Sequence, residues 1–417
     1  MLQTIGKVLG MSRYLWEDFL RVNPTRLLPL LTDPRHLQYR VSVEELQIEW
    51  EAKVSQCSAP KAIPRILNTW KDDHLFRIDL RHVLGRCGPF GLFSQEITEL
   101  AEVVVSAALE HVCAELSTDH GVPVLESGRQ CGFVVAGLGK FGGVEMGFGS
   151  DIELFLIYDQ DCRTNGRKSL SAGSYFERVI HRLQTTIESR RKGIFEIDLR
   201  MRPYGQAGPA AVTLAAFMNY FAPQGDAWPY ERQALTRLRC VAGDGALIEQ
   251  IRDARRKIVF GEALFDFSAM KAIREKQINQ LVRGGTLNAK LSDGGLVDCE
   301  YAVQALQMTF GHHFPNLQTT NTILALEAAA EADLLTQDEV DGICSAYRLL
   351  RELIDCLRMV RGNAEDLTIP DPDSADFRQL GRRMRAVHAA PEALTELEPA
   401  MQTVRQFSAR VEQICQN

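Results

Sequence analysis

Several features that define specialised protein classes are missing from this sequence. Its ten cysteines include no Cys-x-x-Cys pair, so neither a zinc ribbon nor a thioredoxin-like redox motif has support. No apolar run approaches the roughly 18–20 residues of a membrane span, and charged residues interrupt the amino-terminal segment that a secretory signal would occupy. We therefore expect a cytoplasmic protein with reduced thiols and no membrane partner.

An excess of basic residues is missing as well. The 47 Lys and Arg residues are outnumbered by 54 Asp and Glu residues, which gives a net charge of −7. A protein whose main task is to bind a nucleic-acid backbone needs clustered positive charge, so we expect no nucleic-acid partner. A composition of 45% hydrophobic and 24% charged residues is that of a globular protein, and 417 residues predict two or three domains.

Hydrophobic periodicity divides the chain into three parts. Helical spacing runs through residues 1–121 and returns after residue 261, most clearly in Thr320–Leu335 and Glu339–Val360. Between them, Gly132–Ala136, Ile152–Tyr158 and the alternating Phe195–Met201 predict strands, with a helix over Tyr175–Ser189 before the last one. We predict an α+β fold in which a small mixed-sheet domain (122–260) is flanked by an N-terminal helical region (1–121) and a C-terminal helical bundle (261–417).

A glycine-rich segment follows the first predicted strand, and two interpretations compete for it. Gly137-x-Gly139-x-x-Gly142, with Asp159 about 20 residues further on, fits a dinucleotide-binding fold. A parallel crossover, however, needs a dozen or more residues that are usually helical, and only Gly143–Ser150 separate the third glycine from the next strand. The length of this connection excludes a crossover helix and decides against the dinucleotide fold.

The second interpretation starts from two acidic residues. At i and i+2 on a strand, Asp151 and Glu153 project from one face, about 6.5–7 Å apart. Neighbouring carboxylates repel each other unless a hard cation such as Mg²⁺ lies between them. The glycine-rich loop supplies N–H groups that can approach a triphosphate, with Lys140 as a mobile positive charge and Ser150 as a hydroxyl ligand. This pattern predicts a site for nucleotide phosphates.

A third carboxylate occurs in the alternating segment Phe195–Met201. Asp198 can complete the metal cluster and activate an attacking hydroxyl, while Arg200 or Arg202 can neutralise developing phosphate charge. A solvated strand face with cross-strand ion pairs is the alternative.

Three other charged residues near this segment stay outside the candidate set. Glu145 fits a structural salt bridge as well as an orienting role. Arg237 and Arg239, at i and i+2 on a predicted helix, cannot both face one ligand, so we predict that one of them is a surface charge.

The motifs, taken together and in this order, resemble those of the glutamine synthetase adenylyltransferases, also called adenylyl-removing enzymes, of the DNA polymerase beta-like nucleotidyltransferase superfamily. The resemblance extends from about residue 75 to 365, and the segments that carry it are Gly137–Glu145 with Ser150–Leu154, Asp198–Gly208, Tyr230–Arg239, Gly294–Tyr301 and Ala346–Arg351. It implies that residues 122–260 form the nucleotidyltransferase domain.

The resemblance also implies roles for individual residues. Asp151, Glu153 and Asp198 would hold Mg²⁺ and form the catalytic set, and the loop would cradle the phosphates of the substrate ATP. The full set of expected nucleotide-binding residues is Gly137, Gly139, Lys140, Gly142, Gly143, Ser150, Arg200 and Arg202. The sequence departs from the family in two respects. It has Glu153 where the family usually shows Asp, and it carries one catalytic unit where the bifunctional family enzyme carries two.

The activity that the resemblance implies is adenylyl transfer from ATP to a tyrosine of glutamine synthetase, or phosphorolytic removal of that group. Two alternatives stay open: the same chemistry on another acceptor, such as uridylylation of the signalling protein PII, and a regulatory module that binds nucleotide without turnover. The intact set of Asp151, Glu153 and Asp198 counts against the second alternative. The direction of transfer cannot be predicted, because addition and removal use the same residues.

Overall fold

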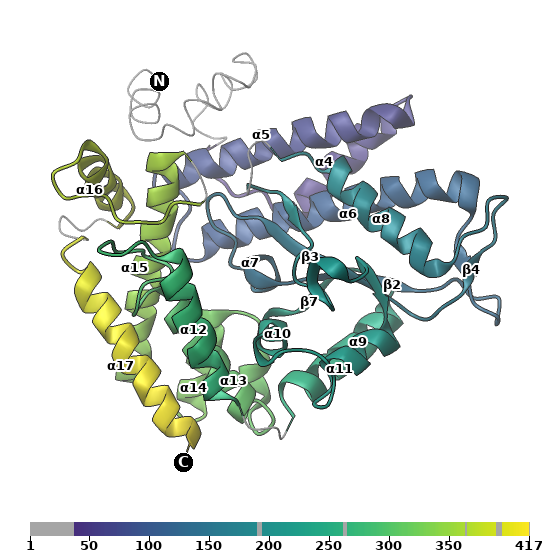
Figure 1. The fold of residues 1–417 in the computed structure, drawn as a ribbon. Coiled ribbons are helices and arrows are strands. Elements are labelled where there is room, and N and C mark those ends of the chain that lie inside the picture. Colours follow the sequence, from purple (N-terminus) through teal and green to yellow (C-terminus); the bar gives the residue numbers. More distant parts are fainter. Residues whose placement is uncertain (1–36, 190–193, 262–264, 363–364, 389–393, 417) are drawn as a thin grey trace.

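The computed structural model describes residues 37–189, 194–261, 265–362, 365–388 and 394–416. Helices surround a small mixed sheet in these ranges (Figure 1), which confirms the predicted α+β fold. Residues 1–36 of the predicted N-terminal helical region lie outside the described residues. None of the described helices combines the length and the apolar character that a membrane crossing would require.

The N-terminal part of the described chain is a layer of helices. It consists of α4 (Val43–Ser55), the 3₁₀ turn η2 (Pro60–Ala62), α5 (Ile63–Val83) and α6 (Leu92–His120). Helix α4 begins at Ser42 because the Ser42 hydroxyl accepts the N–H of Glu45 at 3.2 Å, while the Glu45 carboxylate accepts the N–H of Ser42 at 2.8 Å. Helices α5 and α6 pack against each other, and α6 also covers the sheet together with α8.

The sheet is built from short strands. The strands are β1 (Pro123–Val124), β2 (Phe133–Gly137), β3 (Ile152–Tyr158), β4 (Arg163–Thr164), β5 (Ile197–Asp198), β6 (Ala211–Thr213) and β7 (Arg239–Gly243). Strand β2 lies between β3 and β7 and is antiparallel to both, whereas β5 and β6 run parallel to β3 along its other edge. Strands β1 and β4 form a separate antiparallel pair.

Helices and turns connect these strands and cover both faces of the sheet. They are α7 (Gly139–Gly142), α8 (Ala172–Thr186), η3 (Gly205–Ala207), α9 (Leu214–Phe221), α10 (Pro229–Ala234), η4 (Leu235–Arg237) and α11 (Gly245–Val259). Leu154 and Leu156 of β3 face the core formed with α6 and α8, while Phe155 and Ile157 face α9 and α11. Burial on both faces explains why β3 is a continuous apolar run.

The predicted strand Phe195–Met201 is wrong in its length. Within this segment, only the two residues of β5 pair with β3. Phe195 takes a φ of 55°, a region that non-glycine residues rarely use, and the Asp198 carboxylate accepts the N–H of Arg200 at 2.9 Å. Both features turn the chain, so the alternation of polar and apolar residues continues for longer than the strand does.

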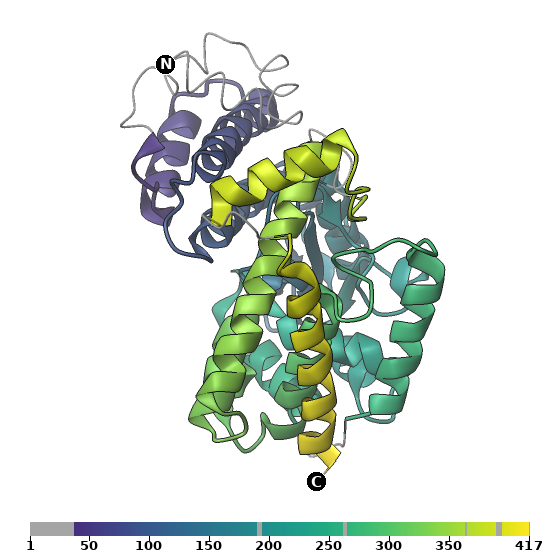
Figure 2. The same cartoon turned by 90° about the vertical axis from the view of Figure 1, so that its left-hand side faces the viewer.

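Long helices form the C-terminal part, as predicted. The helices are α12 (Phe267–Leu281), α13 (Leu296–Phe310), α14 (Thr322–Glu331), α15 (Gln337–Arg361), α16 (Ala375–His388) and α17 (Leu397–Gln416). The short 3₁₀ turn η5 (Pro315–Gln318) lies between α13 and α14. Helix α15 begins with a capping box of Thr336 and Glu339 and ends at Gly362, which adopts the left-handed conformation. Figure 2 shows α15 and α17 side by side, with α16 crossing near one end of α15.

The division into three domains at residues 121 and 260 stays a prediction. The core on one face of the sheet continues into the N-terminal helices and includes Met359 of α15.

A buried histidine in α5 predicts a pH-dependent stability. The His82 ring stacks on Phe93 with ring centroids 3.8 Å apart, and its Nε2 is buried without a hydrogen-bond partner. Burial, with a smaller contribution from Arg383, lowers the pKa of His82 to about 3. The His82 side chain therefore binds a proton near pH 6.5 in the unfolded chain but only near pH 3 in the folded chain. Its contribution to the free energy of unfolding is fully present above pH 6.5 and is lost as the pH falls toward 3.

We expect His82→Phe, which keeps the stacking, to remove this loss. Between pH 6 and pH 4, urea denaturation of the wild type is expected to show a free energy of unfolding that falls by up to about 1.4 kcal/mol per pH unit more steeply than that of the variant. Equal slopes for the two proteins would contradict the assignment.

Candidate functional site

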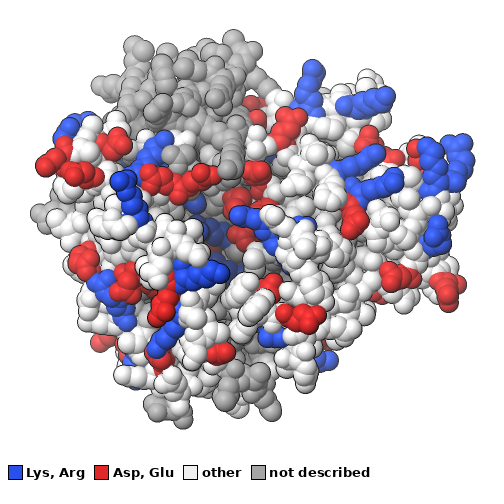
Figure 3. All heavy atoms as spheres, in the orientation of Figure 1, with Lys and Arg blue, Asp and Glu red and all other residues white. Residues whose placement is uncertain are grey.

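The three predicted carboxylates lie where β3 and β5 meet. The parallel register places Glu153 directly beside Asp198, and Asp151 immediately precedes β3. All three side chains are half-buried. In the space-filling view, acidic and basic side chains gather around a hollow near the centre of this face (Figure 3). The fold thus brings the Asp151–Glu153 pair and Asp198 to one edge of the sheet.

Glu153 lies against the glycine-rich loop. Gly139 has a φ of 50°, and a Cβ at this position would lie 2.4 Å from Oε1 of Glu153. Burial and, to a smaller extent, the neighbouring Asp151 raise the pKa of Glu153 to about 7, and Lys290 opposes both effects. A side chain at position 139 would displace this carboxylate from its present place, so the position of Glu153 depends on Gly139.

Asp198 is held by Arg200. Its Oδ1 and Oδ2 accept hydrogen bonds from Nε of Arg200 at 3.0 and 2.8 Å, and Oδ2 also lies 2.5 Å from Nη2. Burial favours a higher pKa for Asp198, but the hydrogen bonds from Arg200 outweigh it and hold the pKa below its ordinary value. Within the described ranges, no three His, Cys, Asp or Glu side chains are grouped closely enough to hold a metal ion in this conformation.

Two lysines belong to this region: Lys290 lies near Glu153, and Lys140 is part of the glycine-rich loop. Burial holds the pKa of Lys140 well below its ordinary value, and the nearby Arg358, Arg351 and Lys290 lower it further. No hydrogen bond or salt bridge engages the Lys140 ammonium among the residues that the structure describes. Lys290, in the connection between α12 and α13, is a site residue that sequence reasoning missed, because a single lysine in a loop gives no pattern.

Most of the loop glycines serve packing. A Cβ on Gly142 would lie 1.9 Å from the carbonyl oxygen of Arg237, and one on Gly137 would lie 2.8 Å from the ring of Phe141. A Cβ on Gly143 would lie 3.1 Å from the carbonyl oxygen of Thr320. These glycines let α7 pack closely against its surroundings, whereas Gly139 faces the carboxylates.

Helix α15 fixes the loop that precedes Asp151. Oδ1 of Asp355 accepts the N–H of Phe148 at 3.0 Å, and Nη1 of Arg358 donates to the carbonyl of the same residue at 2.8 Å. Ser150 is buried and its Oγ accepts the N–H of Gly147 at 2.9 Å, so this hydroxyl also holds the loop.

Arg351 extends the contact between α15 and the loop by donating to the carbonyl of Glu145 at 2.6 Å. Sequence reasoning missed Asp355 and Arg358. Their spacing from Arg351, at i, i+4 and i+7, places three charged residues on one face of a helix and is the signal that was available.

Glu145 and Arg237 form a buried ion pair, and Arg237 also lowers the pKa of Glu153 slightly. Oε1 of Glu145 accepts the N–H of Thr322 at 2.6 Å, and Arg237 lies 3.3 Å from Glu300. Arg239, in strand β7 instead of a helix, donates to the carbonyls of α7. The prediction that one of the two arginines is a surface charge is therefore wrong, because both guanidinium groups bind partners inside the fold.

Arg200 and Arg202 differ in what they can reach. The Arg200 side chain is 68% exposed, so its guanidinium can also meet a ligand. Arg202 donates to the carbonyl oxygens of Leu199, Gln206 and Gly208, and it stabilises the turn after β5.

Two family models match the chain. The model described as glutamate-ammonia ligase adenylyltransferase matches residues 2–254, and the model described as GlnD PII-uridylyltransferase matches residues 268–417.

Similar curated proteins carry the name bifunctional glutamine synthetase adenylyltransferase/adenylyl-removing enzyme. The one from Shewanella woodyi is 26% identical over 96% of this chain and 42% of its own length. Those from Thioalkalivibrio sulfidiphilus and Psychromonas ingrahamii are 31% and 27% identical over 85% and 90% of this chain, and over 37% and 40% of their own lengths. The chain thus spans about two fifths of the length of these relatives.

Proposed function

The chain belongs to the glutamate-ammonia ligase adenylyltransferase family, and from this premise we propose that it moves an adenylyl group between ATP or ADP and a tyrosine of glutamine synthetase. The observation that carries the proposal is the parallel register of Glu153 and Asp198, with Asp151 beside them and Lys290 near Glu153. Carboxylates and a lysine in this arrangement suit the transfer of a phosphoryl-linked group. We also propose that the reaction takes place in the cytoplasm.

The donor set fits Mg²⁺, and Asp151, Glu153 and Asp198 would hold it. Carboxylate oxygens are the ligands that this ion prefers. Neither Asp151 nor Glu153 has a hydrogen-bond or ion-pair partner within the described ranges, so both carboxylates are available. The bound ion would supply charge neutralisation at the α-phosphate.

The loop residues would bind the rest of the nucleotide. Lys140 and Lys290 supply positive charge for the phosphates, and the N–H groups of the loop around Gly139 supply hydrogen-bond donors. Arg200, whose side chain is largely exposed, would neutralise charge on the transferred group. Arg202 and the Ser150 hydroxyl would hold the surrounding turns in place, and Gly137, Gly142 and Gly143 would keep α7 closely packed.

The attacking oxygen needs a proton acceptor. When the group is added, the tyrosine hydroxyl attacks the α-phosphorus of ATP and pyrophosphate leaves. Asp198 lies at the sheet edge and would accept the hydroxyl proton at Oδ1 or Oδ2 once it releases Arg200. When the group is removed, inorganic phosphate attacks the same phosphorus, ADP forms and the tyrosine oxygen takes a proton back.

A second candidate function is uridylylation of the protein PII. The match of residues 268–417 to a PII-uridylyltransferase model favours it. That match covers the bundle and leaves the carboxylates outside, whereas the adenylyltransferase model includes all three. We therefore place glutamine synthetase first as the protein substrate and PII second.

Intact-mass analysis tests the proposal. In the first reaction, glutamine synthetase is incubated with this chain, Mg²⁺ and ATP. In the second, adenylylated glutamine synthetase is incubated with this chain, Mg²⁺ and phosphate. A gain of one AMP in the first reaction, or its loss in the second, is expected and assigns the direction. The parallel reaction with PII and UTP tests the second candidate. Unchanged masses in all three reactions, with the chain shown to be folded, would overturn the proposed activity.

A further inference from the structure

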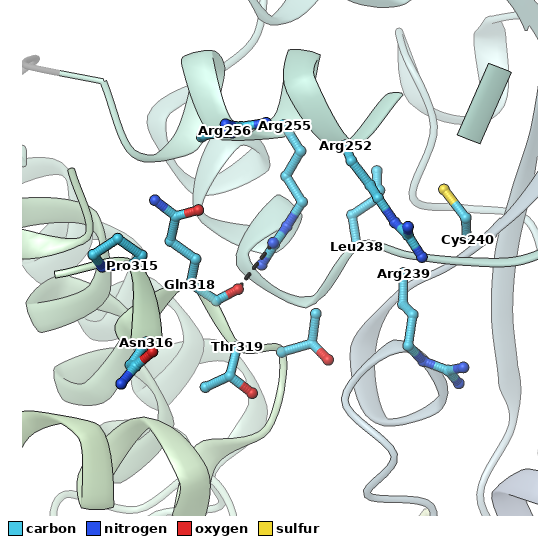
Figure 4. A pocket seen from close by; sticks show the side chains of 11 residues that line it. Leu238, Arg239, Cys240, Arg252, Arg255, Arg256, Pro315, Asn316, Gln318 and Thr319 are labelled. Carbon is cyan, nitrogen blue, oxygen red and sulfur yellow. Dashed lines mark hydrogen bonds between the residues drawn. The ribbon is translucent and has the colours of Figure 1, made fainter. Parts of the chain in front are cut away.

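A second basic cavity lies on the opposite edge of the sheet from Asp198. It has a volume of about 600 Å³ and is bounded by α11, by the start of β7 and by the segment 315–320 (Figure 4). Four arginines, Arg239, Arg252, Arg255 and Arg256, contribute to its lining. None of the residues that line it is acidic. A cavity of this size can enclose a small ligand, and its lining selects a negatively charged one.

Arg255 contributes a guanidinium that is not neutralised. It donates to the carbonyl oxygens of Leu235 at 2.9 Å and Gln318 at 3.0 Å, and also to that of Thr236. No carboxylate pairs with it among the described residues, and burial lowers its pKa to about 10. Figure 4 shows its side chain reaching from α11 toward Gln318. Carbonyl groups fix the position of this cation without cancelling its charge.

The other arginines differ in their partners. Arg239 forms a partly buried ion pair with Glu102 of α6 at 2.6 Å, whereas the two exposed arginines are only weakly neutralised. Arg252 pairs with Glu249, and Arg256 pairs with Asp253, each three residues earlier on the exposed surface of α11. Exposed pairs of this kind contribute little and exchange readily with other anions. Both guanidinium groups are therefore available to a ligand.

The cavity wall also contacts the glycine-rich loop. Nε and Nη2 of Arg239 donate to the carbonyl oxygens of Gly142 at 3.0 Å and Phe141 at 2.9 Å, at the end of α7. Nδ2 of Asn321, next to the segment 315–320, donates to the carbonyl of Gly143 at 3.1 Å. A ligand that moves Arg239 or this segment therefore changes the hydrogen bonds that hold α7.

We propose that this cavity is an effector site for a small phosphate-bearing molecule of up to nucleotide size, separate from the carboxylates. Phosphate is favoured because planar guanidinium groups bind its oxygens in pairs, and several arginines line this cavity. Occupancy is transmitted to the loop through Arg239. The regulatory part rests on the proposed function, whereas binding to the cavity does not.

Calorimetric titration with inorganic tripolyphosphate, without Mg²⁺, tests binding. The double variant Arg252→Gln/Arg256→Gln removes two exposed arginines four residues apart, and we expect it to weaken binding at this site about tenfold or more. Arg378→Gln/Arg382→Gln removes the same charge at the same spacing from α16, and we expect it to bind as the wild type does. Lys140→Ala weakens the proposed nucleotide site and leaves the cavity unchanged. In this variant, the tripolyphosphate binding that depends on Arg252 and Arg256 is expected to persist.

Equal affinities for the wild type and the Arg252/Arg256 variant would overturn the proposal, whatever the mass analysis of glutamine synthetase gives. Citrate distinguishes phosphate from carboxylate chemistry, and citrate binding as tight as that of tripolyphosphate would overturn the assignment to phosphate. In the AMP-transfer assay, with the free Mg²⁺ concentration held constant, tripolyphosphate is expected to change the rate of the wild type more than that of the Arg252/Arg256 variant. Equal responses of the two proteins would overturn the regulatory part alone.

Discussion

Asp151→Asn is expected to abolish AMP transfer without unfolding the protein. The change removes one negative charge from the carboxylate group at the start of β3 and keeps the size of the side chain. If this charge contributes about 4 kcal/mol to the stabilisation of the transition state, the rate falls about a thousandfold. Because Asp151 has no hydrogen-bond or ion-pair partner in the described ranges and lies beside another acid, the melting temperature is expected to stay the same or rise slightly.

The matched control for Asp151→Asn is Asp333→Asn. Asp333 is exposed in the turn after α14, and its positive φ suits asparagine equally well. The rate of AMP transfer by each variant, measured by intact mass, and its melting temperature separate the two effects. A variant at position 151 that keeps more than a tenth of the wild-type rate would remove this residue from the catalytic set.

Gly139→Ala is expected to lower AMP transfer about 100-fold. The new Cβ would overlap the Glu153 carboxyl group, which has to move away from its place beside Asp198. A displacement of about 1 Å in a catalytic group is enough for a loss of this size. The positive φ of Gly139 adds about 1–2 kcal/mol of backbone strain to the folded state.

Gly128→Ala provides the control for that strain. Gly128 has a φ of 82°, but a Cβ there meets nothing within 4 Å. Both variants are therefore expected to lose similar stability in urea denaturation, and only Gly139→Ala is expected to lose activity. Equal activities for the two variants would mean that the contact between Gly139 and Glu153 has no part in the reaction.

Local patterns predicted those parts of the fold that local interactions determine. Apolar periodicity located α14 and α15, and the family resemblance carried by the ordered motifs is confirmed. The alternation in 195–201 predicted too long a strand, because the turn depends on the backbone of Phe195 and on the bond between Asp198 and Arg200. A polar and apolar alternation does not reveal where a strand loses its partner.

The candidate site was predictable only where its residues are close in sequence. Asp151 and Glu153 follow from the two-residue period of a strand, and their roles in catalysis stay predictions. Lys290 and the contacts of Asp355 reach the site from the bundle, across a large separation in sequence, and only the folded chain reveals them. Phosphate binding by the glycine motif stays a prediction, and three of its four glycines also lie in close contact with neighbouring residues.

The hydrogen bonds between α15 and Phe148 affect the order in which parts of the chain fold during synthesis. Strands β2, β3, β5 and β7 can pair once residue 243 has left the ribosome, yet Asp355 and Arg358 emerge much later. Until then, the N–H of Phe148 lacks its acceptor, the C=O of Phe148 lacks its donor, and the buried Glu145 lacks Arg351. Because unpaired buried groups are costly, the loop before Asp151 acquires its final shape only when α15 docks. The loop before Asp151 is thus expected to reach its final arrangement late in synthesis, after the sheet itself has formed.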